Sequence, residues 1–182
     1  MTSLSLPRTN RHIPGRTRPR FDLAPVTRAL IGAAGIAMSI LCAYALIRGL
    51  LGLAPSHGAA REWAIRLHLA TVLPAVPLGA WVMLARKGTP RHRTLGKLWL
   101  VLMVVTALST LFIRHVNGGS LSWIHLFVPL TLHGAWKTIA TARAGNIAKH
   151  RANLVGMYLG ALMIPGVFAF LPGRLMGSWL LG

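Results

Sequence analysis

Residues 64–85 read AIRLHLATVLPAVPLGAWVMLA, an almost uninterrupted apolar run with a single cation, Arg66, near its start. At about 1.5 Å of rise per helical residue, such a run crosses the roughly 30 Å of hydrocarbon in a bilayer. Comparable apolar segments occupy residues 29–54, 95–113, 121–141 and 152–172. The sequence therefore predicts an all-α transmembrane protein, a five-helix bundle.

The composition of the 182-residue chain supports the same class. Apolar side chains make up 54% and charged ones 12%, with 20 Lys plus Arg against 2 Asp plus Glu, whereas a soluble domain carries about a quarter charged residues. Asp22 and Glu62 are the only carboxylate side chains, so the chain has no pair of acidic residues for acid–base catalysis and too few oxygen ligands for calcium or magnesium. Cys42 is the single cysteine, and no serine lies in a nucleophile elbow. Soluble enzymes, and hydrolases in particular, are excluded.

Positive charges predict the orientation. Residues 1–28 form a basic, proline-broken stretch, interpreted as a disordered cytosolic tail near anionic lipid, with a transit peptide or a nucleic-acid arm as alternatives. This tail and the connections around residues 86–97 and 137–151 hold 15 of the 20 cations, so the N-terminus is predicted to be cytosolic. Residues 29–172 are then the five-span membrane domain and 173–182 a short outer interfacial tail. Trp63, Trp123 and Trp179 fall at the outer interface.

Because this charge is spread over both membrane edges without base-stacking aromatics, no specific nucleic-acid partner is expected. The bilayer, with anionic lipids at its cytosolic face, is the expected partner.

Local signals predict where the helices begin and pack. Gly88 followed by Thr89-Pro90 indicates a helix stop, an N-cap and a first-turn proline, and Gly145-Asn146 indicates a stop and an N-cap. Pro74 and Pro77 predict a kink in the second helix. Small residues predict close helix packing at Gly35 with Ser39 and at Gly156 with Gly160.

An internal repeat relates the second and third helices to the fourth and fifth. An offset of 57 residues aligns His68-Leu69 with His125-Leu126, and one inserted residue later His92-Arg93 aligns with His150-Arg151. The triplets at 79–81 and 134–136, both Gly-Ala-Trp, recur slightly out of register. The two hairpins are therefore predicted to be duplicates related by a pseudo-two-fold axis along the membrane normal.

The repeat would place four histidines in two pairs. His68 and His125 are expected about 6 to 8 Å below the outer boundary, and His92 and His150 in first helical turns at the cytosolic edge. Paired imidazoles between membrane helices are typical ligands of a b-type haem. These four histidines are the candidate metal ligands of a haem protein that transfers electrons across the membrane, with a quinone or another redox protein as partner.

Haem propionates need cations at the membrane edge. Arg48 and Arg66 are the outer candidates, and Arg93 and Arg151 the inner ones. The alternatives are that the histidines form hydrogen bonds at the membrane interface, or that the His-Arg pairs bind lipid phosphate groups. In that case the protein is a cofactor-free scaffold or assembly subunit.

A polar stripe on the fourth helix suggests a further function. His125, Pro129, His133 and Lys137 recur at every fourth position and lie on one face. His133 and Lys137 are therefore candidates to line a pocket for a small anion or a quinone, in a transporter or lipid-binding protein. Alternatively, His133 packs against protein and Lys137 snorkels to the cytosolic rim.

Short motifs resemble a known family. Lys-Gly-x-x-x-His-Arg-x-x-Gly (residues 87–96) and His-x6-Met-Tyr (residues 150–158) resemble a bacterial family of predicted multi-pass membrane proteins, domain of unknown function 2306, over residues 30–172. The resemblance implies a bacterial inner-membrane location and implies no activity. More distantly, the helices with two histidine pairs resemble di-haem cytochrome b proteins, from which this chain departs because its inner histidines lie at helix starts.

Overall fold

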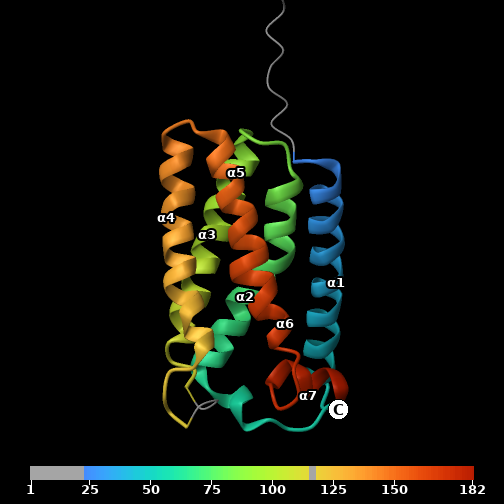
Figure 1. Cartoon of the computed structure of the whole chain (residues 1–182). Helices are drawn as coiled ribbons and strands as arrows, with labels where there is room; N and C mark the ends of the chain where they lie inside the picture. The colour runs from blue at the N-terminus through green and yellow to red at the C-terminus, as the bar shows by residue number, and fades with distance from the viewer. Residues whose placement is uncertain (1–22, 115–117) are drawn as a thin grey trace, which may run out of the picture.

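The computed structural model describes residues 23–114 and 118–182, so most of the predicted tail lies outside the described residues. The described chain is helical, without strands, and its main helices alternate in direction (Figure 1). They are α1 (Pro25–Leu50), α2 (Trp63–Leu84), α3 (Pro90–Thr110), α4 (Phe127–Arg143) and α5 (Ile147–Gly156). A short turn, η1 (Gly58–Arg61), precedes α2, and η3 (Trp123–Leu126) precedes α4.

The last long helix changes its winding midway. α5 continues into a π-helical segment, η4 (Met157–Met163), and then into α6 (Ile164–Phe168). Within the described residues, four helices are long and apolar enough to cross a membrane: α1, α2, α3 and the continuous helix Ile147–Phe168. α4 has 17 residues and is not among the four. The membrane class predicted from the sequence is therefore confirmed.

The predicted helix starts are confirmed in detail. The Thr89 side chain accepts a hydrogen bond from the backbone N–H of His92 at 3.1 Å, with Pro90 in the first turn. Asn146 accepts one from the N–H of Lys149 at 3.1 Å. Gly88 and Gly145 have φ values of +79° and +67°, which a glycine adopts without strain. The sequence interpretation assigned Pro25 to the irregular tail, but in the structure Pro25 begins α1. Proline is tolerated at this position because the first N–H groups of a helix have no hydrogen-bond partner within the helix.

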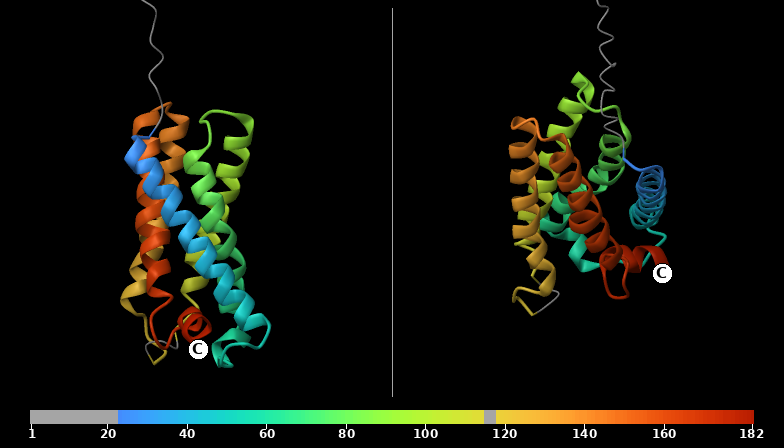
Figure 2. Two further views of the ribbon diagram at one scale, coloured as in Figure 1. Left: turned by 90° about the vertical axis from the view of Figure 1, so that its right-hand side faces the viewer. Right: turned by 45° about the horizontal axis from the view of Figure 1, so that its top comes forward.

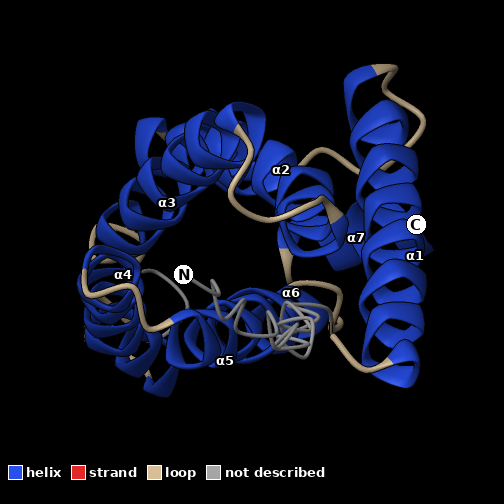
Figure 3. Cartoon of the chain, turned by 90° about the horizontal axis from the view of Figure 1, so that it is seen from above, coloured by secondary structure: helices blue, strands red, loops and turns tan. Residues whose placement is uncertain are grey.

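Seen along their axes, α2, α3, α4 and α5 with α6 form a ring, and α1 lies outside it (Figure 3). α1 crosses the bundle obliquely (Figure 2) and contacts α2 and the C-terminal helix α7 (Leu175–Leu181). The connections α2–α3 and α4–α5 lie at the same end of the molecule as the start of α1 (Figure 1). We call this the basic end, because it carries Arg86, Lys87, Arg91, Arg93, Arg143, Lys149 and Arg151.

The proline-containing middle of α2 anchors the core. α2 contains Pro74 and Pro77 in its interior. The carbonyl of Ala75 accepts a hydrogen bond from Trp99 Nε1 at 3.0 Å, and the carbonyl of Val76 accepts one from the Tyr158 hydroxyl at 3.2 Å. Both aromatic side chains are fully buried. Two polar groups thus hold α3 and η4 against the same turn of α2.

Replacing Trp99 by phenylalanine tests this contact. Trp99→Phe removes the indole N–H and leaves the buried Ala75 carbonyl without that partner, so we expect a loss of about 1–3 kcal/mol in unfolding free energy. Trp136→Phe is the control, because Trp136 is 64% exposed. Thermal unfolding in detergent should show a lower midpoint for the first variant alone; equal midpoints would contradict the assignment.

Residues 173–182, predicted to be a short outer interfacial tail, include a helix. Their helix α7 is bound to α1 through Arg48, whose Nη1 donates to the Leu180 carbonyl at 2.7 Å. Trp179 is buried over Gly49, where a Cβ atom would lie 2.4 Å from the indole ring. Of the three tryptophans predicted at the outer interface, Trp63 and Trp123 are 62% and 54% exposed, whereas Trp179 is buried against α1.

Candidate functional site

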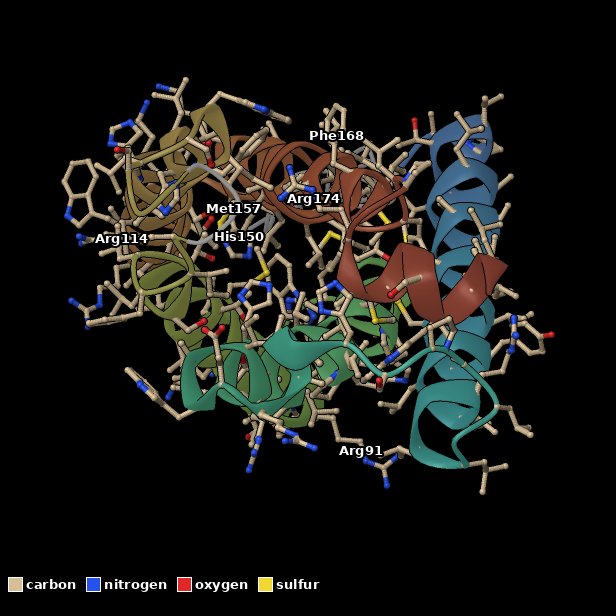
Figure 4. All side chains as sticks on the ribbon, turned by 90° about the horizontal axis from the view of Figure 1, so that it is seen from below. Arg91, Arg114, His150, Met157, Phe168 and Arg174 are labelled. Atoms are coloured by element: carbon tan, nitrogen blue, oxygen red, sulfur yellow. The ribbon has the colours of Figure 1, made fainter. Side chains whose placement is uncertain are left out.

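A cavity of about 360 Å³ lies within the ring at the end opposite the basic end. We call this end the cavity end; Figure 4 views the molecule from it. The deeper wall of the cavity is apolar and includes Val76, Met103 and Leu162. Helix α1 contributes Met38 and Cys42 to the lining. The volume is in the range of cavities that bind small molecules and cofactors.

His68 is the histidine of the predicted outer pair that lines this cavity. Its Nδ1 lies 3.2 Å from the Thr106 carbonyl, 3.2 Å from Ser109 Oγ and 3.3 Å from Thr110 Oγ1. Both hydroxyls donate their single proton to the Thr106 carbonyl, so Nδ1 must carry the hydrogen. The neutral ring then has its lone pair on Nε2. An anchored Nδ1–H with a free Nε2 is the arrangement of metal-binding histidines.

His125 occupies a different local structure. It lies in η3, where its Nδ1 accepts a hydrogen bond from the Ser122 N–H at 3.0 Å and also lies 3.1 Å from the Ser122 carbonyl. Its Nε2 is buried without a partner among the described residues. Ser122 lines the cavity, whereas His125 does not. The Ser122 backbone offers Nδ1 both a donor and an acceptor, so either tautomer can form.

His92 and His150 lie near each other at the basic end. The Nδ1–H of His150 donates to the Thr138 carbonyl at 2.9 Å, which leaves the lone pair on Nε2. His92 is buried, its Nδ1 has no partner among the described residues, and it is within electrostatic range of Lys87 and His150. Figure 4 shows His150 and Met157 inside the ring and Arg91 outside it.

Two of the arginines predicted to hold propionates bind backbone carbonyls instead. Arg48 donates to the carbonyls of Leu180 and Leu53, and Arg66 to those of Ala60 and Arg61 at 3.2 and 2.7 Å. Neither lines the cavity. The physical reason is local: carbonyls at chain turns need donors, and a long arginine beside them supplies these. Arg93 is exposed and Arg151 half-buried, both at the basic end.

The two residues predicted to line a pocket on α4 lie away from this cavity. His133 and Lys137 are exposed, and neither lines the cavity. The His133 ring packs beside Trp136, with centroids 5.9 Å apart. The buried face of α4 consists of Val128, Thr131, Ala135 and Thr138. The predicted stripe is not one face, because His125 lies in η3 and is buried, whereas Pro129, His133 and Lys137 are exposed on α4.

Sequence reasoning did not identify Arg174 as a site residue. Arg174 lies between α6 and α7, is half-buried and lines the cavity. The oxygen atoms that anchor His68 were also not recognised, although Thr106, Ser109 and Thr110 share a helix face near the same membrane edge. Arg174 carried no such signal, because only the path of the chain after α6 brings it to the cavity.

A ring of apolar helices around a ligand-sized cavity defines a multi-pass helical membrane protein with an internal cavity. The family model described as "Predicted membrane protein (DUF2306)" matches residues 65–177, and the chain belongs to this family. The match covers α2 to α6, the segment that forms the ring, and confirms the resemblance inferred from the motifs. No curated protein and no solved structure matches the chain.

Proposed function

We propose that the protein crosses a bacterial inner membrane five times, with its N-terminus in the cytosol. η3 and α4 together cover Trp123–Arg143 and run alongside the four apolar helices (Figure 1), which supports a fifth span. Cations concentrate at the basic end, as they do at cytosolic edges. The two Gly-Ala-Trp triplets support duplicated hairpins: both alanines are buried, at 9% and 5% exposed, while both tryptophans point outward. The cavity then opens toward the outer face.

In this cavity the protein holds a b-type haem and transfers electrons. The observation that carries the proposal is His68: three oxygen atoms of α3 surround its protonated Nδ1, and the ring lines a ligand-sized apolar cavity. This is how proteins orient a histidine that ligates a metal. The apolar walls suit a macrocycle, and a bound haem would supply one-electron transfer.

His125 is the proposed second ligand. Its Nε2 is buried and has no partner among the described residues, and the Ser122 carbonyl lies within reach of a protonated Nδ1. In this tautomer Nε2 would be free to ligate. The role of the chain is to hold both rings, to exclude water from the space between the helices and to insulate the site from lipid.

A second haem at the basic end is supported by His92 and His150. His150 has its Nδ1 anchored in the same way as His68, and His92 has a buried Nδ1 without a partner among the described residues. Arg93 and Arg151 are two of the cations at this edge and directly follow the two histidines in sequence. We expect a haem to occupy this second site less fully than the first, because the cavity lies at the opposite end of the molecule.

A titration with haemin tests the proposal. Protein purified in detergent should bind haemin saturably and give the Soret band of six-coordinate low-spin haem, with sharp visible bands after reduction, because two imidazoles are available as axial ligands. The control is haemin in the same detergent without protein. A spectrum indistinguishable from that control would overturn the haem proposal.

A quinone in the same cavity is the second candidate. The observation that favours it is that His68 lines the cavity while His125 does not, so a single imidazole of the predicted outer pair faces this space. The free Nε2 of His68 could accept a hydrogen bond from the hydroxyl of a quinol. A protein of this kind would give no Soret band with haemin but would bind decylubiquinone saturably.

A further inference from the structure

The cavity is lined by one arginine, Arg174, that has no acidic partner among the described residues. Arg174 lines the cavity, and its guanidinium makes no hydrogen bond or ion pair with the described residues. Glu62 is the single acidic residue in the described part of the chain, and it does not line the cavity. A half-buried cation at the edge of an apolar space favours an anionic ligand.

Polar groups from two other connections reach the same cavity. His57, on the α1–α2 connection, lines it and has a buried Nδ1 without a partner among the described residues. Ser122 lines it from the connection before η3. Three segments far apart in sequence thus place an arginine, an imidazole and a hydroxyl around one apolar space.

The segment that carries Arg174 is held in place. The Arg174 N–H donates to the Leu171 carbonyl at 3.1 Å, and the Ser178 N–H donates to the Arg174 carbonyl at 2.8 Å. Gly177 packs so closely against this turn that a Cβ atom would lie 2.2 Å from the Leu171 oxygen. Arg174 is therefore on a fixed backbone, which reduces the entropy lost when it binds a ligand.

We propose that Arg174 binds the carboxylate of an amphiphilic ligand whose apolar body fills the cavity toward Val76 and Met103. The inference rests on the proposed function in one respect: if the ligand is haem, the carboxylate is a propionate. Arginine suits this role because its planar guanidinium donates two parallel hydrogen bonds to a carboxylate. His57 and Ser122 are the neutral groups able to complete the site. Arg174 thus replaces Arg48 and Arg66 as the outer propionate partner.

Haemin and its dimethyl ester, which lacks the carboxylates, test the inference. The unmodified protein should bind haemin at least tenfold more tightly than the ester. Arg174→Gln should lower haemin affinity about tenfold or more and leave ester affinity unchanged, since a charge-assisted hydrogen bond is being removed. Arg174→Lys should restore part of the difference. Arg114→Gln is the matched control, because Arg114 is exposed and its Nε bonds the Leu111 carbonyl.

The outcomes separate this inference from the haem proposal. If Arg174→Gln weakens the binding of haemin and of the ester equally, or changes the binding of neither, the carboxylate site is refuted while the haem proposal stands. If haemin does not bind at all, cis-parinaric acid and its methyl ester replace the pair, with energy transfer from tryptophan as the signal. A preference for the acid that is lost in Arg174→Gln then supports the carboxylate site alone; no preference, or no binding of the acid, refutes it.

Discussion

Gly79→Leu is expected to prevent the protein from reaching its native state. A Cβ atom at position 79 would lie 2.6 Å from Trp99 Nε1 and 2.7 Å from the Tyr158 ring, closer than packed side chains approach. Neither ring can withdraw, because both are fully buried and hydrogen-bonded to carbonyls of α2. Overpacking of a core costs typically 1–3 kcal/mol, and we expect about 3 kcal/mol or more for a leucine at this position. That is a large part of a typical folding free energy.

Thermal unfolding and size-exclusion chromatography in detergent measure the effect. Gly79→Leu should elute as aggregate or unfold at a much lower temperature. Gly160→Ala is the matched control, because it also lies in a long helix but has no other atom within 4 Å of the added Cβ. Gly160→Ala should unfold at the same temperature as the parent protein or slightly above it, since alanine favours the helix. A monodisperse Gly79→Leu with parental stability would show that α2, α3 and η4 do not meet as described.

The elements most accurately predicted from sequence are those determined by local chemistry. Thr89 and Asn146 cap helices because a short polar side chain accepts from a backbone N–H three residues ahead, an interaction independent of the rest of the fold. Gly35 also makes the close contact expected of it, with a Cβ position 2.7 Å from Ala80 and from the Tyr158 hydroxyl. Apolar length alone was sufficient to recognise the membrane class.

Features that depend on how the helices are rotated and where a loop returns were not predictable in the same way. Gly156 and Gly160 have the spacing of a packing motif, yet no other atom lies within 4 Å of an added Cβ at either position. His133 follows His125 by eight residues but is exposed, because His125 lies in the 3-10 turn η3, whose residues per turn differ from those of the α-helix α4. Helix periodicity gives relative positions around an axis, and only tertiary packing gives the absolute direction.

His68→Ala is expected to eliminate haem binding at the outer cavity. The substitution removes the one imidazole that lines this cavity with an anchored Nδ1. Loss of an outer-shell partner of a metal ligand costs about 10–100-fold in affinity, so loss of the ligand itself should exceed this range. The fold should tolerate the change, because the Thr106 carbonyl keeps the hydrogen bonds from the Ser109 and Thr110 hydroxyls.

Two further variants test whether the effect of His68→Ala comes from the loss of a haem ligand. Ser109→Ala removes one of the oxygen atoms around Nδ1 and should weaken haemin binding without abolishing the low-spin spectrum. His133→Ala is the control, because it deletes an exposed imidazole of the same chain and should leave the titration unchanged. If His68→Ala kept the parental Soret band and affinity, another group would hold the haem. The anchored ring would then be explained as a hydrogen bond that joins α2 to α3 across the membrane interior.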